Sequence, residues 1–286
     1  GASVFIRNQI GTQKSSGSGF VVSSTADHLL VATNAHVVAP EETSTKVPSK
    51  ILAQVNKASL TILFESGTVN ERSAKGEVVA FDPIADVAIV RVKTADVKNP
   101  PKALKIEGAK ALAETSTVYT FGFPFGDKLS TGKGPAITVG KASVSSLRTN
   151  DVGKLTTIQI DGNLNPGNSG GPVLDAEGIV IGVATAIIRD SQGIGLIVPI
   201  AEVHAMLSGK VVLLNADYQK QTDGKLKVAF EAFISNPTGK VGPIALPRVE
   251  LYPTSTWTQN RTRELIREAI SNRPTYIARG VAEESA

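Results

Sequence analysis

Residues 162–173 read Gly-Asn-Leu-Asn-Pro-Gly-Asn-Ser-Gly-Gly-Pro-Val and place a single serine, Ser169, among glycines. A serine hydroxyl is a weak nucleophile, so acyl transfer here needs a neighbouring base and donors for the oxyanion that forms on attack. Gly167 and Gly170 can adopt backbone angles that turn successive N–H groups toward one point. The stretch therefore indicates a nucleophile loop, and a plain glycine-rich turn is the alternative.

Two stretches upstream contain a candidate base and a candidate acid. Residues 30–38, Leu-Val-Ala-Thr-Asn-Ala-His-Val-Val, predict an apolar strand that ends in a turn with His36. Residues 81–92, Phe-Asp-Pro-Ile-Ala-Asp-Val-Ala-Ile-Val-Arg-Val, place Asp86 at the start of another apolar strand. An imidazole can act as a general base, and an acid bound to its other nitrogen sets its tautomer. The order His, Asp, Ser is that of chymotrypsin, and it differs from the orders in subtilisin and α/β-hydrolases.

Asp82 is the alternative acid. It precedes Pro83 in a turn, where an aspartate commonly binds its own backbone, whereas Asp86 begins the apolar strand. We therefore favour Asp86. The other two histidines, His28 and His204, have no comparable surroundings and are interpreted as packed or exposed residues.

Longer motifs around these residues resemble the HtrA (Deg) group of trypsin-like serine proteases. They are Thr-Asn-Ala-His-Val-Val at 33–38, Asp-Pro-Ile-Ala-Asp-Val-Ala-Ile-Val at 82–90 and Asn-Pro-Gly-Asn-Ser-Gly-Gly-Pro at 165–172. Secondary landmarks, such as Ser-Gly-Ser-Gly-Phe at 16–20, follow in the same order. The resemblance covers roughly residues 15–208. It implies two six-stranded antiparallel barrels of the chymotrypsin type, with the active site in the cleft between them.

The spacing of apolar residues independently indicates an all-β fold. Short apolar or alternating runs bounded by Gly, Pro, Asn or Ser recur before residue 200, as is typical of a barrel or sandwich. A helical pattern over 199–207 stops at Gly209, so we place the protease domain at residues 1–209. Residues 210–286 are predicted to form a small β-rich appendage with a helix near 261–271. No carboxylate-binding loop of the PDZ type is recognisable there.

Composition argues against several other classes of protein. Of the 286 residues, 41% are hydrophobic and 20% are charged, which is ordinary for a globular protein. A formal net charge of +4 predicts no specific binding of nucleic acid. The chain has no cysteine and no paired histidine spacing, so we expect neither a metal nor a cofactor. There is no apolar run of about 18 residues, so we expect no transmembrane segment.

The resemblance implies a serine endopeptidase that works through an acyl-enzyme. Ser169 is then the nucleophile, His36 transfers the proton, Asp86 orients His36, and the oxyanion hole lies at Gly167, Asn168 and Ser169. The implied substrates are unfolded or flexible polypeptides in protein quality control. Trimers are common in this group, and the bacterial periplasm or cell envelope is the expected location, with the cytoplasm as the alternative. A conditionally inactive scaffold with a binding or chaperone-like role is the alternative function.

The same resemblance predicts the primary specificity pocket. Asn163, six residues before the nucleophile, would lie at its base, and without a charge there we expect no preference for Arg or Lys. The Asn163 amide could instead select a polar side chain such as Gln or Thr. The backbone of residues 184–187 would pair with the substrate as an added antiparallel strand. The remaining walls are mostly aliphatic, which favours Val, Ala, Leu or Ile; they are Leu164, Ala184, Thr185, Ala186, Ile187 and Leu196.

Overall fold

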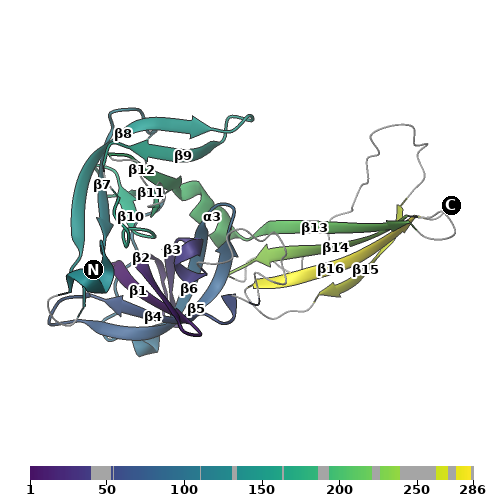
Figure 1. Cartoon of the computed structure of the whole chain (residues 1–286), viewed down its shortest axis with the longest axis horizontal. Coiled ribbons are helices and arrows are strands. Elements are labelled where there is room, and N and C mark those ends of the chain that lie inside the picture. The colour runs from purple at the N-terminus through teal and green to yellow at the C-terminus, as the bar shows by residue number, and fades with distance from the viewer. Residues whose placement is uncertain are drawn as a thin grey trace.

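The computed structural model forms two closed six-stranded barrels that lie side by side, and a four-stranded sheet that extends away from them (Figure 1). The structure describes residues 1–39, 53, 55–109, 111–130, 134–162, 164–185, 193–220, 226–238, 262–269 and 275–284. Every strand pair in the three sheets is antiparallel. The two barrels expected from the sequence are confirmed.

The first barrel has the strand order β1-β2-β3-β6-β5-β4. Alternation along β1 shows how the sequence directs its faces. Val4 and Ile6 point into the barrel core, whereas Phe5 between them packs outside against Phe123, with ring centroids 5.5 Å apart. The elements are β1 (Ser3–Ile10), β2 (Gln13–Ser24), β3 (His28–Thr33), α1 (Ala35–Val38), β4 (Ser59–Phe64), β5 (Arg72–Asp82), β6 (Val87–Lys93) and η1 (Thr94–Asp96).

The second barrel has the order β10-β11-β12-β9-β8-β7 and its own apolar core. Val118, Ile158, Val173 and Ile197 are fully buried in that core. The elements are β7 (Thr117–Gly122), η2 (Gly126–Leu129), β8 (Thr138–Thr149), β9 (Leu155–Ile160), β10 (Pro172–Leu174), β11 (Val180–Thr185), β12 (Gly195–Pro199) and α3 (Ile200–Ser208). The helix α3 ends where predicted, because Gly209 has a φ of +90° that favours glycine.

A third apolar cluster joins the two barrels. Phe20 and Ile89 of the first barrel pack in it with Val183 of the second, and Val203 and Met206 of α3 complete it. All five side chains are fully buried. Burial of apolar area on this scale fixes how the barrels lie against each other, and it thereby fixes the distance between residues that the two barrels bring together.

The C-terminal sheet has the order β13-β14-β16-β15 (Figure 1). Its strands are β13 (Lys210–Lys220), β14 (Leu226–Ser235), β15 (Thr262–Ala269) and β16 (Thr275–Glu284). The helix predicted near 261–271 is therefore wrong, since β15 occupies 262–269 and pairs with β16. Helical spacing of four apolar residues is a weak local signal, and pairing with a partner strand that local sequence does not reveal overrides it.

This sheet is attached to the first barrel by apolar packing. Leu213 of β13 and Phe233 of β14 belong to the core cluster of that barrel, and Phe233 is fully buried. Just beyond β14, the Thr238 hydroxyl donates to the Leu207 carbonyl of α3 at 2.9 Å. The sheet begins where the sequence places a boundary, at residue 210, but it shares a core with the domain before it. A separate domain over 210–286 stays a prediction.

A buried ionic cluster secures the start of the sheet. Lys210 Nζ lies 2.7 Å from Asp82 Oδ2 and 3.2 Å from Glu202 Oε2, and Lys154 also pairs with Glu202. Burial favours a lower pKa for Lys210, but its bonds with Asp82 and Glu202 outweigh that effect and raise the pKa. Burial likewise favours a higher pKa for Glu202, yet Lys154 and Lys210 hold the pKa below its ordinary range.

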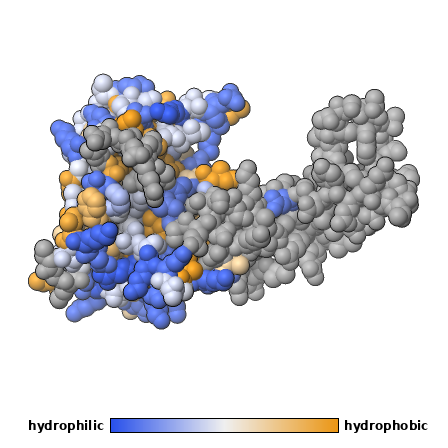
Figure 2. Space-filling model, viewed as in Figure 1, coloured by the Kyte–Doolittle hydropathy of each residue, from blue (hydrophilic) through white to orange (hydrophobic). Residues whose placement is uncertain are grey.

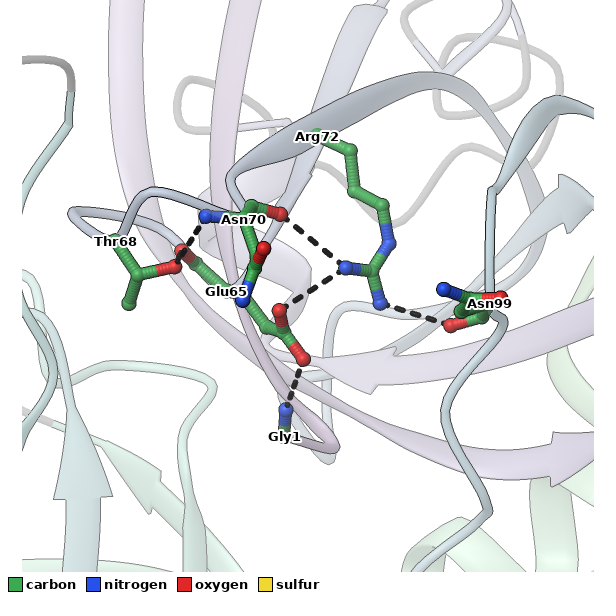
Figure 3. Close-up of polar contacts among 6 residues, drawn as sticks. All are labelled: Gly1, Glu65, Thr68, Asn70, Arg72 and Asn99. Atoms are coloured by element: carbon green, nitrogen blue, oxygen red, sulfur yellow. Dashed lines mark hydrogen bonds and ion pairs between the residues drawn. The ribbon is translucent and has the colours of Figure 1, made fainter.

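A surface network closes the turn between β4 and β5 (Figure 3). The Arg72 guanidinium donates to Glu65 Oε2 at 3.0 Å and to the Asn99 carbonyl at 2.8 Å, while the Gly1 amino group lies 3.3 Å from Glu65 Oε1. The hydrogen bond from Arg72, together with the amino group, lowers the pKa of Glu65. These contacts tie β1, the turn and the segment after η1 together.

Most of the barrel surface seen in Figure 2 is hydrophilic, with apolar residues scattered among the polar ones. Among the described residues, the most exposed large apolar side chains are Val69 and Val152, which lie in hairpin turns and are 89% and 85% exposed. None of the helices in the described parts of the chain is long and apolar enough to cross a membrane.

Replacing Lys210 with methionine will lower the free energy of unfolding, because the buried Asp82 carboxylate loses its cation. The Lys210 side chain is 25% exposed, so we expect a loss of about 2 kcal/mol at pH 7, between that of a surface pair and a buried pair. Pairing raises the pKa of Lys210, so its contribution is complete below the ordinary value of 10.5 and is lost as pH rises through the folded value. Urea titrations of parent and variant should thus converge at strongly alkaline pH. The exposed Lys93→Met is the control, and equal losses in both variants would contradict the expectation.

Candidate active site

His36 and Asp86 meet at the mouth of the first barrel. His36 lies on α1, the single helical turn that follows β3, and Asp86 lies directly before β6. The His36 Nδ1 atom is 2.9 Å from Asp86 Oδ2 and 3.0 Å from Oδ1. The two side chains are 27% and 17% exposed, so the pair is partly shielded while the imidazole still faces solvent. The predicted base and acid are therefore in contact.

Several further hydrogen bonds hold Asp86 in one orientation. The His36 backbone N–H donates to Asp86 Oδ1 at 3.1 Å, and the Thr185 hydroxyl donates to Oδ2 at 3.1 Å. The Asn34 side-chain amide donates to the Asp86 carbonyl at 2.8 Å. Asp86 itself has a φ of +55°, a strained value for an aspartate. Such strain persists only where surrounding contacts impose it, and it is frequent at functional sites.

Asp82, the alternative acid, has a structural role. Its Oδ1 atom accepts the N–H groups of Ile84 at 2.9 Å and Ala85 at 3.0 Å, which is the turn geometry expected of an aspartate before proline. Its Oδ2 atom pairs with Lys210. Both carboxylate oxygens are thus used away from His36, which contacts Asp86 and not Asp82.

Ser169 lies in the loop before β10, and backbone hydrogen bonds connect this loop to both barrels. The Ser169 carbonyl accepts the Ser18 N–H of β2 at 2.7 Å. The Gly170 N–H donates to the Ala184 carbonyl at 2.9 Å, and Ala184 immediately precedes the Thr185 that binds Asp86. A Cβ atom on Gly170 would lie 2.1 Å from the Ser18 carbonyl oxygen, so only glycine fits there. These contacts bring the serine loop next to the strand end whose Thr185 binds Asp86.

Gly17 connects the serine loop with the helix that carries the histidine. A Cβ atom placed on Gly17 would lie 2.6 Å from the Val37 side chain and 3.0 Å from the Ser169 carbonyl oxygen. Val37 follows His36 directly, so Gly17 of β2 lies beside both the helical turn that carries His36 and the backbone of Ser169. Ser169 is 5% exposed. The structure therefore places His36 in contact with Asp86, and it places the backbone of the serine loop beside the same strand of the first barrel as the turn that carries His36.

The geometry of the predicted oxyanion hole supports Gly167 but not Asn168. Gly167 has a φ of +100°, and the preceding carbonyl, that of Pro166, accepts the Phe125 N–H at 2.6 Å. The Asn168 N–H instead donates to the Asn165 carbonyl at 3.0 Å and is not available to a substrate oxygen. Of the three residues predicted to form the hole, Asn168 therefore does not contribute its N–H, because the turn that shapes the loop uses that group internally.

The predicted specificity pocket is described in part. Asn163, Ala186 and Ile187 lie outside the described residues. Leu164 is half-buried and packs against the core of the second barrel, and Leu196 is half-buried opposite Thr185 in the β11–β12 register.

Thr185 and Ala184 were expected to line the pocket, but their contacts and burial indicate other roles. The Thr185 hydroxyl binds Asp86, and the side chain is 8% exposed, so it supports the acid. Ala184 is fully buried, with its N–H and carbonyl taken by Gly171 and Gly170, so its backbone cannot pair with a substrate. From the sequence alone, a threonine in a strand cannot be identified as a pocket residue or as a partner of an acid. Among the described residues, no group of three or more histidines or acids lies close enough to hold a metal.

Comparison with known proteins agrees with this geometry. Residues 17–183, more than half of the chain, match the family profile of the trypsin-like peptidase domain. The chain belongs to the trypsin-like peptidase family. The matched span includes His36, Asp86 and Ser169, together with every strand from β3 to β10.

Within this family the chain is similar to HtrA proteins. It is 35% identical to the putative serine protease HhoB of Synechocystis sp. over 192 residues. The aligned region covers 66% of this chain and 38% of HhoB. It is 33% identical over 189 residues to the mitochondrial serine protease HTRA2 of Bos taurus, covering 65% and 34%. The chain thus spans well under half the length of these relatives.

Solved structures show the same likeness. The HtrA-type protease AlgW, in a structure with a tripeptide, aligns with a TM-score of 0.52 at 26% identity, covering 77% of this chain and 66% of that chain. Deg5 aligns with a TM-score of 0.52 at 25% identity, covering 71% and 85%. The predicted resemblance to the HtrA group is confirmed.

Asparagine substitutions will separate the two acids. Asp86→Asn should slow the reaction of Ser169 with a fluorophosphonate by about four orders of magnitude, because an amide favours the wrong imidazole tautomer. Asp82→Asn keeps an acceptor for the turn but loses the charge that pairs with Lys210, so it should lower stability while the rate stays within about threefold. Labelling kinetics and thermal unfolding, measured on both variants, test this. A slow Asp82 variant beside a fully reactive Asp86 variant would reverse the assignment.

Proposed function

We propose that this protein is a serine endopeptidase that cleaves polypeptides through an acyl-enzyme. The observation that carries the proposal is the His36–Asp86 pair, assembled at the loop that holds Ser169. A paired imidazole beside a serine loop is the arrangement that makes a serine hydroxyl nucleophilic. The similarity to serine proteases of the HtrA group supports the same reaction.

The proposed mechanism assigns one role to each group. Ser169 Oγ attacks the carbonyl carbon of the scissile bond while His36 Nε2 accepts the hydroxyl proton. Asp86 keeps the Nδ1 proton of His36 in place and stabilises the imidazolium that forms. The N–H groups of Gly167 and Ser169 bind the oxyanion. His36 then returns the proton to the leaving amine, and water hydrolyses the ester by the reverse sequence of roles.

Unfolded or flexible polypeptides are the proposed substrates, with protein quality control as the setting. An extended chain can reach the cleft between two barrels and pair with a strand, which a compact protein cannot do without local unfolding. Because Ala184 is already paired within the protein, we place the substrate strand beyond it, toward Thr185 and the residues that follow. A trimeric assembly stays a prediction from the HtrA resemblance. A location in the cell envelope also stays a prediction, since the relatives include a mitochondrial protein.

A conditionally inactive scaffold is less well supported. Such a role would leave the histidine and acid apart in the resting protein, whereas here His36 Nδ1 lies within hydrogen-bond distance of both Asp86 oxygens. Thr185 and Asn34 add fixed contacts to the carboxylate and the backbone carbonyl of Asp86, respectively. The geometry of the acid and base favours the enzyme.

Removal of the nucleophile is the direct test. Ser169→Ala should lower the turnover of casein by about a million-fold without unfolding the protein, because no packing atom other than Oγ is lost. The fluorophosphonate should label the parent and leave this variant unlabelled. Ser59→Ala, which removes an exposed hydroxyl at the start of β4, is the matched control and should behave as the parent. Casein cleavage by the Ser169 variant within tenfold of the parent would refute the proposal.

Cleavage-site mapping will test the uncharged pocket. Leu164 and Leu196 are aliphatic, and without an acid to bind Arg or Lys we expect cuts after Val, Ala, Leu or Ile. One methylene of fit is worth only about 1–3 kcal/mol, so the preference should be graded. Mass spectrometry of a denatured protein digest gives the residue before each cut. A preference for Gln would indicate selection by Asn163, and dominance of Arg or Lys would contradict the aliphatic pocket.

A further inference from the structure

Ser18 is a fully buried residue of β2 that contacts the serine loop without belonging to the triad. Its hydroxyl donates to the Gly167 carbonyl at 2.6 Å and accepts the Phe123 N–H at 3.0 Å. Its backbone N–H donates to the Ser169 carbonyl at 2.7 Å, and its own carbonyl accepts the Thr33 hydroxyl at 2.7 Å. The hydroxyl therefore joins the segment at Phe123 to the serine loop, where the oxyanion hole is predicted.

Two successive peptide groups determine the direction of the Gly167 N–H. In a trans peptide the carbonyl and the N–H point in opposite directions, so the bond from Phe125 to the Pro166 carbonyl aims the Gly167 N–H away from Phe125. The next peptide group is held at both ends. The Ser18 hydroxyl binds the Gly167 carbonyl, and the Asn165 carbonyl binds the Asn168 N–H.

The conformation of Gly167 depends on these restraints. At a φ of +100°, Gly167 lies in a region that glycine enters about as readily as others, so local preference does not select it. A Cβ atom there would lie 2.3 Å from the Phe123 carbonyl oxygen, which shows how closely the two loops approach. Only the hydrogen bonds on either side keep the Gly167 N–H in one direction, and Ser18 provides the one side-chain bond among them that the described residues show.

We propose that Ser18 is a positioning residue of the oxyanion hole. Its hydroxyl bridges Phe123 and Gly167 and so orients the Gly167 N–H toward the substrate oxygen; this rests on the proposed endopeptidase function. Without the hydroxyl, the Gly167 carbonyl loses its donor in a buried setting, and the peptide group that follows can rotate. The Gly167 N–H is then no longer preorganised toward the position where the negative charge of the oxyanion develops.

The proposal also accounts for the Gly-Ser-Gly sequence at 17–19. A Cβ atom on Gly17 would lie 3.0 Å from the Ser169 carbonyl oxygen, and one on Gly19 would lie 3.1 Å from the Ala32 carbonyl oxygen. Glycine at position 17 lets β2 approach the serine loop closely enough for Ser18 to bind it with both its hydroxyl and its backbone, whereas Gly19 leaves room for β1 and β3 of the same barrel. A larger residue at position 17 would hold the Ser18 hydroxyl too far from the loop.

The effect of the hydroxyl should fall on kcat. An oxyanion donor acts on charge that exists only in the transition state, so its misalignment lowers kcat and leaves KM nearly unchanged. Complete removal of one donor costs about 10²- to 10³-fold. Because Ser18→Ala misdirects the donor and does not delete it, we expect a loss near the lower figure, about 100-fold.

The experiment compares the full-length parent with Ser18→Ala, Ser18→Cys and Ser66→Ala. Ser66 is the matched control, since it is also a buried serine with a hydrogen-bonded hydroxyl, which contacts Glu71 in the β4–β5 turn. We would measure kcat and KM for casein, the rate of fluorophosphonate labelling, and the pH dependence of kcat. The expected result for Ser18→Ala is a kcat and a labelling rate both lower by about 100-fold, with KM and the pH midpoint as in the parent. Ser18→Cys, whose thiol is a weak donor, should have a kcat and a labelling rate between those of the parent and Ser18→Ala. Both values should match the parent in Ser66→Ala.

Each outcome decides the matter. If the parent is active and Ser18→Ala retains kcat within about threefold, Ser18 does not position the hole, although the endopeptidase function stands. A shifted pH midpoint or a raised KM would show a general disturbance of the site and would also overturn the proposal. If Ser18→Ala does not fold, Ser18→Cys is judged by the same measurements. A parent without reactivity would refute the proposed function, and the inference with it.

Discussion

The partly buried carboxylate of Asp86 is the constraint on which the site depends. A charge removed from water must be compensated by donors, and here they come from both barrels: His36 from the first and Thr185 from the second. The acid can be satisfied only when the barrels are packed in their correct relation, which the apolar cluster between them provides. Global packing and local chemistry therefore reinforce each other at this residue.

Asp82 and Asp86 show how position decides the role of the same side chain. Four residues apart, one aspartate shapes a turn and pairs with a lysine, and the other binds an imidazole. The turn made by Asp82 leads directly into the strained backbone of Asp86, so the first acid helps to present the second. Lys210, the first residue of β13, forms an ion pair with Asp82. The C-terminal sheet is thereby connected to the turn that leads to Asp86.

The two barrels and the pairing of His36 with Asp86 were predictable because their motifs are dense and their chemistry needs particular residues. The role of Thr185 was not, since a strand threonine looks the same whether it faces a pocket or an acid. Sequence does not show which amide a turn consumes, so it does not reveal that the Asn168 N–H is bound within the loop. The helix predicted over the residues of β15 is wrong because local spacing does not reveal the partner strand β16. The bridging hydroxyl of Ser18 had only the flanking glycines as a signal.

Phe233 fills the core of a barrel whose strands all lie before residue 94. During synthesis on the ribosome, that core would therefore stay incomplete until the second barrel and the first strands of the C-terminal sheet have emerged. Contacts between residues so far apart in the chain are slow to form. The nascent first barrel would meanwhile expose the apolar surface that Leu213 and Phe233 later cover, which makes it a target for chaperones. A protein proposed to act on unfolded chains would thus pass through such a state itself.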